Sequence, residues 1–460
     1  MAPAVQEYHY LGASTLTGRD LRLQTSGGHA ADGSAPAALE HPRFFTGFLT
    51  TAEAAAAGLL AVAEVARTRY YQPVNPASLD PVVTGSRDRL RFESFSGCCG
   101  VYARLDVLSA ALEGQVHDRG TTNVDVNGPL REALARVGGA DPLHLAVGPD
   151  ELAVTTLDGP VVEKKVPLPE RWLRGFAEVQ VIAAAFDLRA ELPAAEGLRF
   201  LRSLPGGRRQ GGALWAVPAG RSLRLASRPA SGAVCVPGPQ RLEALGRLLR
   251  HARALRVYGP VVGPTSPPSA SAWELVLQGM RLLLMVSPEP HRGFSGEGAV
   301  LDALAGDQVA ADADLIGALL AFEPRLEVDL LAERSGLSAA EVLAALGQLG
   351  TAGRVGYDLA EAAYFHRELP YDAGRVERMN PRLANARVLV ASGAVRLDGC
   401  LASVVVDGHE HRVRFDGDGA AACTCPWWAR YRGSRGKCKH VLAAELARAG
   451  RPAAVQAETP

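Results

Sequence analysis

Three cysteines and one histidine near the C-terminus have the types and the spacing of a metal site. Cys423 and Cys425 lie two positions apart, and Cys438 and His440 repeat that spacing after twelve intervening residues. Thiolate and imidazole groups bind Zn²⁺ in tetrahedral geometry, and four protein ligands leave no position for water, as in structural sites. We therefore predict one structural Zn²⁺ bound by Cys423, Cys425, Cys438 and His440.

Buried thiols or disulfides are the alternative to a metal site. Two cysteines at positions i and i+2 of a strand do not reach disulfide geometry, and pairing among three thiols leaves one over. The imidazole ligand favours zinc over an iron–sulfur cluster. His409 and His411 also lie nearby, alternating along a predicted strand, and we predict that both face the solvent.

Aromatic and cationic residues are interleaved between the two ligand pairs. We predict a contact surface made of Trp427, Trp428, Arg430 and Arg432. Such side chains stack on bases and bind phosphates, and they also anchor protein interfaces, so both kinds of partner stay open. Lys437 and Lys439 are predicted to offset the negative charge of three thiolates around one Zn²⁺.

The metal motif and its surroundings resemble the SWIM zinc finger, a small ββα module with the pattern CxC-x(n)-CxH. The resemblance covers residues 385–450 and implies a hairpin over 401–415 and a helix over 441–446. More loosely, the rest of the chain resembles long bacterial SWIM-containing proteins with an uncharacterised N-terminal region. That resemblance implies protein partners of the MoxR-type AAA ATPase and von Willebrand A-domain classes. The resemblance to the zinc finger itself is carried by Cys423, Cys425, Pro426, Cys438, Lys439 and His440.

Residues 312–368 have the pattern of a winged helix. Helices are predicted over 314–322, 327–334 and 339–349, the last with Ser338 as its N-cap, and segments 354–357 and 363–365 would pair as the wing. The third helix normally reads DNA. Here it contains no arginine or lysine, and its one charge, Glu341, repels phosphate. We therefore predict a scaffold or protein-docking unit.

The whole chain is predicted to be an α+β protein of several domains, with a winged-helix-like unit and a C-terminal ββα SWIM-type zinc module. Residues 24–42 and 120–127 are predicted loops, and 273–287 is either a strand pair or a helix. Predicted helices cover 51–69 with Thr51 as cap, 171–186 and 239–253, and predicted strands cover 89–95, 101–108, 143–147 and 152–156. The predicted domains are 1–205, 206–300, 305–372 and 385–450, followed by a disordered tail over 451–460.

Composition excludes several classes of protein. Forty-nine basic and forty-nine acidic residues give a formal net charge of zero, so no overall field attracts polyanions. We expect a cytosolic protein without a membrane span, because the chain lacks a signal peptide and an apolar run of membrane length. Cys98 and Cys99 are predicted to be buried at a tight strand junction rather than to be redox-active.

No catalytic motif of the GxSxG, GxxxxGK[ST] or HExxH type occurs, so we expect a non-enzymatic protein. The predicted function is that of an adaptor that binds other proteins. The alternative is a DNA- or RNA-binding protein that uses the loop of the zinc finger.

Overall fold

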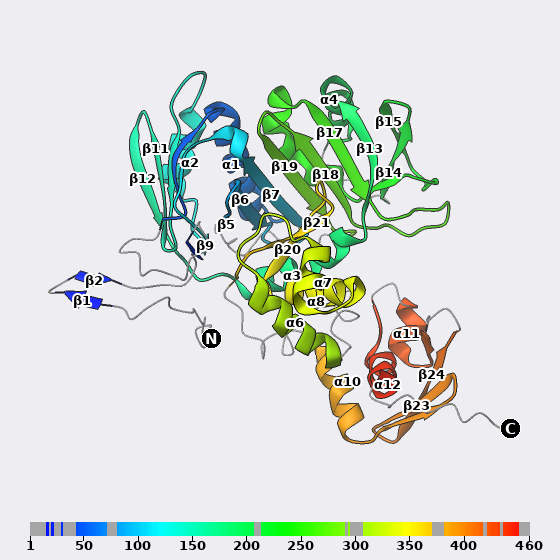
Figure 1. Ribbon diagram of the computed structural model, residues 1–460. Helices are drawn as coiled ribbons and strands as arrows, with labels where there is room; N and C mark the ends of the chain where they lie inside the picture. Colours follow the sequence, from blue (N-terminus) through cyan, green and yellow to red (C-terminus); the bar gives the residue numbers. More distant parts are fainter. Residues whose placement is uncertain are drawn as a thin grey trace. The chain divides into compact units, whose positions relative to one another are not determined.

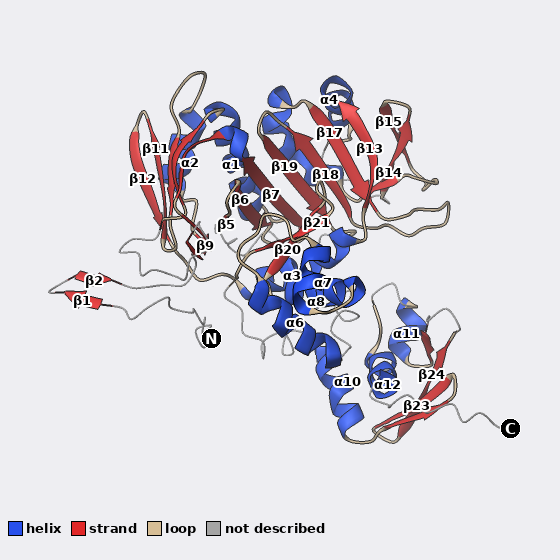
Figure 2. Cartoon of the chain, viewed as in Figure 1, coloured by secondary structure: helices blue, strands red, loops and turns tan. Residues whose placement is uncertain are grey.

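The computed structural model forms two compact units (Figures 1 and 2). Unit 1 contains the described residues of Met1–Phe294, Leu320–Leu326 and Gly353–Pro370, and unit 2 contains the remainder. No helix among the described residues is long and apolar enough to cross a membrane. The described residues are 15–17, 20–22, 29–30, 43–70, 81–206, 213–289, 293–294, 307–369, 381–416, 421–432 and 436–449.

An antiparallel sheet dominates unit 1. Among the described residues it has nine strands in the order β13-β17-β18-β19-β7-β6-β5-β9-β3. The pairing of β19 with β7 joins segments that are far apart in the sequence. The strands are β3 (His29–Ala30), β5 (Val82–Gly85), β6 (Arg89–Phe95), β7 (Val101–Leu108), β9 (Asp118–Asn123), β13 (Asp187–Pro193), β17 (Ala254–Gly259), β18 (Ser271–Val276) and β19 (Met280–Val286).

This sheet contradicts two of the sequence predictions and decides between the alternatives left open by a third. The predicted boundary between 205 and 206 does not divide the fold, because β17, β18 and β19 belong to the same sheet as β5, β6 and β7. Segment 273–287 is a strand pair. The predicted loop over 120–127 is wrong in its first half, where β9 pairs with β5 and the threonines lie in a sheet rather than in turns.

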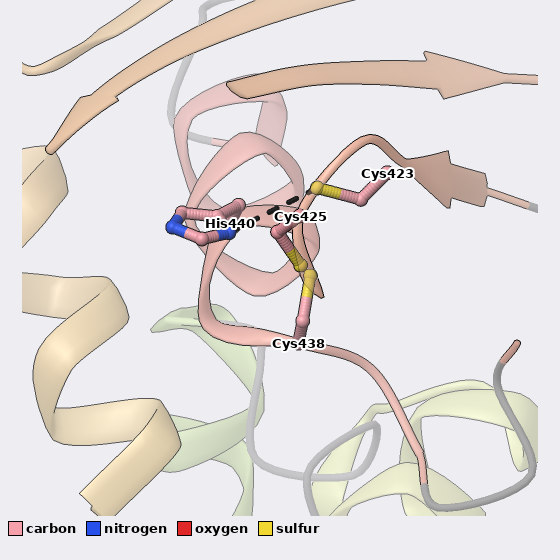
Figure 3. A group of neighbouring side chains, drawn as sticks. All are labelled: Cys423, Cys425, Cys438 and His440. Atoms are coloured by element: carbon pink, nitrogen blue, oxygen red, sulfur yellow. Dashed lines mark hydrogen bonds between the residues drawn. The ribbon is translucent and has the colours of Figure 1, made fainter. Parts of the chain in front are cut away.

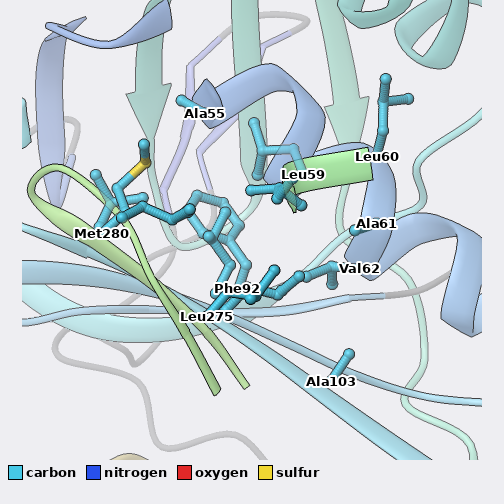
Figure 4. Packing of buried hydrophobic residues seen from close by; sticks show 14 of the residues in the cluster. Ala55, Leu59, Leu60, Ala61, Val62, Phe92, Ala103, Leu275 and Met280 are labelled. Carbon is cyan, nitrogen blue, oxygen red and sulfur yellow. The ribbon is translucent and has the colours of Figure 1, made fainter. Parts of the chain in front are cut away.

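One face of the sheet is apolar and is covered by helices. Alternate residues such as Phe92, Leu275 and Met280 meet Leu59 and Val62 of the first helix in one buried cluster (Figure 4). Alternation places every second strand residue on the same face, and burial of that face supplies the main driving force for folding. The covering elements are α1 (Ala52–Arg67), α4 (Ala194–Ser203) and the 3₁₀ helix η2 (Pro239–His251). A further helix, α2 (Gly128–Arg136), packs against α1.

The helix α1 approaches the sheet closely at a glycine. A Cβ atom on Gly58 would lie 2.8 Å from Leu105 Cδ1, so a larger residue would require the Leu105 side chain to shift. Thr51 precedes this helix as predicted, but its side chain makes no capping hydrogen bond. Packing of the apolar face, not the cap, therefore stabilises α1.

Smaller sheets complete unit 1. A five-stranded sheet has the order β12-β11-β10-β4-β8, and a three-stranded sheet has the order β15-β14-β16. The predicted helix at 171–186 is α3 (Glu170–Ala184). The further elements are β1 (Thr15–Thr17), β2 (Asp20–Arg22), β4 (Phe45–Leu49), η1 (Ser109–Ala111), β8 (Leu112–Val116), β10 (His144–Val147), β11 (Glu151–Thr156), β12 (Gly159–Lys164), β14 (Leu214–Ala219), β15 (Ser222–Ala226) and β16 (Val234–Val236).

The predicted wing is present as the hairpin of β20 (Val355–Asp358) and β21 (Ala363–His366). Its two strands belong to unit 1. Asp358, Phe365 and His366 are buried there. The second face of the nine-stranded sheet is charged, and Arg91 and Arg104 of that face bind the hairpin.

The three helices of the winged-helix region belong to unit 2 and are α6 (Asp307–Leu319), α7 (Val328–Ser335) and α8 (Ala339–Thr351). Ser338 caps α8 as predicted. Its Oγ accepts a hydrogen bond from Glu341 N at 3.3 Å, and Ser338 N donates to Glu341 Oε2 at 2.8 Å. This reciprocal capping box satisfies two otherwise free N–H groups.

The C-terminal part of unit 2 is the predicted zinc module. It has a four-stranded sheet in the order β22-β23-β24-β25 and a preceding helix that packs against the last one. The predicted hairpin over 401–415 is confirmed as β23 and β24. The predicted tail and most of the predicted loop over 24–42 lie outside the described residues. The elements are α10 (Pro381–Ala391), β22 (Val395–Asp398), β23 (Leu401–Val406), β24 (His409–Phe415), β25 (Ala421–Cys423), α11 (Pro426–Tyr431) and α12 (Lys439–Ala449).

Candidate metal centre

The four predicted ligands come from one strand end and two helix starts. Cys423 ends β25, and Cys425 is the N-cap of α11, where its Sγ accepts a hydrogen bond from Trp428 N at 3.4 Å. Cys438 directly precedes α12, and its Sγ accepts from Val441 N at 3.4 Å. His440 lies in the first turn of α12. Both helix starts therefore favour negatively charged sulfur through their free N–H groups and dipoles.

The four side chains point toward one another (Figure 3). Their ligand atoms all lie within 4.8 Å of one another, and Cys423 Sγ lies 3.8 Å from His440 Nδ1. Ideal zinc bond lengths give a tetrahedron with edges of about 3.5–3.8 Å. All four residues are buried, with exposed fractions of 7%, 1%, 2% and 5% in chain order. The arrangement therefore fits one structural zinc.

The pKa values of the three cysteine thiols explain why the site suits a cation. A hydrogen bond from Cys423 lowers the pKa of Cys438 to about 4, and the same interaction raises the pKa of Cys423. Burial raises the pKa of Cys425. Three thiols in so small a space cannot all ionise without a compensating positive charge. A divalent cation supplies that charge and replaces the protons.

The ligands are part of the apolar core of the zinc module. Val404, Val413 and Val441 pack with the three cysteines in one small cluster. Such a core is too small to stabilise a fold alone, and a structural metal is one of the devices that compensate for it. Zinc binding and folding of this module are therefore coupled.

His411 lies next to the metal centre, so the prediction that it faces the solvent is wrong. Its ring stands 4.1 Å from the ring of His440, with an interplanar angle of 31°. The sequence held a signal for this position, because His411, Val413 and Phe415 alternate on β24 and share its inward face. His409 is exposed, as expected.

The predicted contact surface divides into half-buried and exposed residues. Trp427 and Trp428 pack against the core of the module, and Trp427 contacts Tyr431 with 4.6 Å between ring centroids. Arg430 and Arg432 are exposed. The tryptophans therefore serve the fold of the module, and the two arginines extend into solvent.

One of the two lysines predicted to offset the negative charge of the thiolates is paired with another residue. Lys437 Nζ lies 2.9 Å from Glu445 Oε1, so a carboxylate of α12 already pairs with this ammonium group. The compensating role stays a prediction for Lys439.

Cys98 and Cys99 lie outside the metal centre, at the junction between β6 and β7. Cys99 is buried and adopts a positive φ of 53°. Burial raises its pKa to about 12, which keeps the thiol protonated and unreactive at neutral pH. The structural role predicted for Cys99 agrees with this environment.

Comparison with known families identifies two regions of the chain. Residues 410–449 match the family model of the SWIM zinc finger, which contains all four ligands. The C-terminal module is a SWIM zinc finger. Residues 301–356 match the DprA winged helix domain, which covers α6, α7 and α8. The chain thus contains a SWIM zinc finger and a winged-helix region, the two modules predicted from its sequence.

No curated protein matches the chain at a significant level. Among solved structures, proliferating cellular nuclear antigen from Entamoeba histolytica is 11% identical with a TM-score of 0.35, covering 54% of this chain and 99% of that one. The PCNA2–PCNA3 complex from Sulfolobus tokodaii is 11% identical with a TM-score of 0.40, covering 53% and 99%. At these TM-scores, neither likeness assigns a function to the chain.

Proposed function

We propose that this protein is a non-enzymatic, cytosolic adaptor in which the SWIM finger is held by zinc and the helices α6, α7 and α8 form a protein-docking surface. The proposed partners are a MoxR-type AAA ATPase and a von Willebrand A-domain protein, the classes implied by the resemblance to long bacterial SWIM proteins.

The composition of α8 carries this proposal. A DNA-reading helix needs arginine, lysine, asparagine or glutamine on its exposed face. Here the helix exposes Leu343 to 47%, and its one charged side chain, Glu341, is engaged in the capping box. Leu330 of α7 and Leu315 of α6 are also exposed, to 51% and 44%. Leucines exposed on all three helices suit a protein partner better than a phosphate backbone, and α8 itself carries no cation.

The burial of the wing supports the same conclusion. In DNA-binding winged helices the wing adds contacts to the nucleic acid beside the third helix. Here Tyr364, Phe365 and His366 of β21 are buried within unit 1. The buried strand of this wing therefore does not offer these side chains to a DNA groove.

A second candidate function is nucleic-acid binding by the finger. Segment 381–449 contains eleven basic and six acidic residues in a chain that is neutral overall. The side chains of Arg412 and Arg414 on β24 are 75% and 66% exposed, and Arg430 and Arg432 are exposed on and after α11. Clustered arginines of this kind bind phosphates and lose affinity as salt rises.

The adaptor proposal is tested by binding of the purified full-length chain to a purified ATPase and A-domain protein of the same host. Leu343→Glu places a charge on the exposed face of α8 and should weaken binding at least about tenfold, because it removes an apolar anchor. Val405→Glu is the matched control, since Val405 is 45% exposed on β23 of the finger. Failure to bind either partner would refute the proposed partnership, and equal effects of both variants would refute the docking surface.

The second candidate is tested by fluorescence anisotropy with single- and double-stranded oligonucleotides. An adaptor should bind them weakly at physiological salt. Micromolar binding with a steep salt dependence, lost in Arg430→Ala/Arg432→Ala, would favour nucleic-acid binding instead.

A further inference from the structure

Four arginines converge on the charged face of the nine-stranded sheet in unit 1. Arg89 and Arg91 come from β6, Arg104 from β7 and Arg281 from β19. They share this face because Arg91 and Arg281 both lie opposite Asp106 in the strand register, and alternate residues of a strand point to the same side. We call these four residues the arginine cradle.

Asp358 of the hairpin occupies the centre of the cradle. Its Oδ2 accepts hydrogen bonds from Arg91 Nη2 at 2.9 Å and from Arg281 Nη2 at 2.8 Å. Its Oδ1 lies 3.0 Å from Arg104 Nη2, and Arg89 Nη1 lies 3.6 Å from Oδ2. The guanidinium groups hold the pKa of Asp358 far below its usual range, although burial alone would raise it.

The cradle offers more donors than one carboxylate can use. Among the described residues, Arg91 Nη1 and Arg281 Nε are buried and have no hydrogen-bond partner. Buried ion clusters of this kind are seldom the most stable solution, because apolar side chains of similar volume avoid the cost of desolvation. The cradle therefore resembles a binding site for an anion more than a packing device.

The charges also suggest which anion fits. Asp88, in the turn before β6, and Asp106 of β7 offset two of the four positive charges. The hairpin supplies the other two negative charges through Asp358 and Glu361, whose Oε1 lies 2.5 Å from Arg89 Nη1. A phosphate group carries about the same charge, −1.5 to −2 at neutral pH, and binds arginine forks well.

We propose that the arginine cradle is an oxyanion site for a phosphate group, and that Asp358 and Glu361 occupy it as internal ligands. Docking of the hairpin and binding of phosphate are then mutually exclusive. Arg89 and Arg281 lie at the rim, where Glu361 is 22% exposed, so an incoming phosphate would first meet the cradle on that side. This site is independent of the adaptor function and of the zinc centre.

The test removes the internal carboxylate from the cradle and adds inorganic phosphate. Asp358→Ala in the full-length, zinc-loaded chain removes the internal carboxylate, and thermal unfolding is followed with inorganic phosphate against chloride at matched ionic strength. Phosphate should raise the melting temperature of the variant by at least about 2–4 °C more than that of the wild type. The wild type controls for the general stabilising effect of phosphate salts.

Two further comparisons make the result specific. Asp358→Ala/Arg281→Gln should lose the extra shift, and acetate should act more weakly than phosphate because it carries one charge. An equal phosphate shift in the variant and the wild type would overturn the proposal. An equal shift by acetate would overturn the assignment to phosphate.

If Asp358→Ala does not fold, Asp358→Asn replaces it, because it keeps the volume of the side chain and removes its charge. Phosphate should then accelerate amide hydrogen exchange in β20 and β21 and leave exchange in α1 unchanged. Unchanged exchange in the hairpin would refute the competition between hairpin and phosphate.

Discussion

Unit 1 and the SWIM finger solve the problem of stability in different ways. In unit 1, helices bury a large apolar face of a nine-stranded sheet, and the opposite face is held by buried ion pairs. In the finger, a few apolar residues surround three cysteines and a histidine. Small domains bury too little surface to fold on apolar packing alone. The difference shows that a metal ion replaces part of the apolar core in the short finger. In unit 1, where the apolar core is large, buried ion pairs can be kept.

Loss of zinc should have the largest effect, and it should be confined to the finger. Cys438→Ser removes a ligand from a site whose binding energy is of the order of 10 kcal/mol in comparable zinc modules. We expect rapid amide hydrogen exchange over β23, β24 and α12, with α1 and β7 still protected, and less than one zinc per chain by elemental analysis.

Cys400→Ser is the matched control for this prediction, because Cys400 is exposed in the same module and lies outside the ligand set. It should keep its zinc and its protection. Unfolding of unit 1 in the Cys438 variant would contradict the contrast between the two regions.

Breaking the ion cluster of unit 1 should be the second largest effect. Asp358→Asn leaves buried arginines without their shared carboxylate, and removal of one partner from a buried ion cluster costs about 3–5 kcal/mol. Urea unfolding, monitored by amide hydrogen exchange in β6 and β7, should show this loss of stability. Asp398→Asn, on an exposed face of β22, should have little effect.

The charged face of the sheet should also give unit 1 a dependence on pH. Burial raises the pKa of Glu274 to about 7, and its Oε1 accepts a hydrogen bond from the Tyr258 hydroxyl. A pKa raised in the folded state gives stability that is present below the unfolded value, about 4.3, and is lost as pH rises through 7. Glu274→Gln should therefore be more stable than the wild type at pH 8, by about 1–3 kcal/mol.

The same variant should gain little at pH 5, because the wild-type carboxyl group is then protonated. Urea unfolding at both pH values checks the sign. A larger gain at pH 5 than at pH 8 would show that Glu274 is ionised in the folded state.

The smallest effect should come from a helix cap. Ser338→Ala removes the capping box of α8 and should cost about 1 kcal/mol. Thr51→Ala at the start of α1 should cost less, because the Thr51 side chain makes no capping hydrogen bond. Local exchange in the first turn of each helix measures the two effects, and equal costs would mean that capping does not distinguish these helices.

The finger could be predicted from the sequence because its information is local. Both ligand pairs, the hairpin and the helix that follows lie within a short stretch, and Ser338 with Glu341 likewise marks the start of α8 within four residues. The strands β6 and β7 were also predictable from their alternation.

The sheet as a whole could not be predicted, because its partners are distant. The pairing of β7 with β19 depends on packing that no local pattern encodes. The same holds for the cradle, since Arg104 and Asp358 meet only when the hairpin docks. The position of His411 was mispredicted for a different reason. Its alternation with Val413 was visible in the sequence, but four better-spaced ligands, including His440, were already present, so His411 was assigned to the solvent-facing side.

The path of the chain through unit 1 constrains how this protein can be dissected. The sheet ends before residue 295, yet the strands that cover its arginines follow residue 352. A fragment cut after Phe294 would keep Arg91, Arg104 and Arg281 and lose the hairpin of β20 and β21 with its carboxylates. Such a fragment would expose unpaired arginines, so it should bind polyanions regardless of their sequence. Binding data from the fragment would therefore not describe the intact protein.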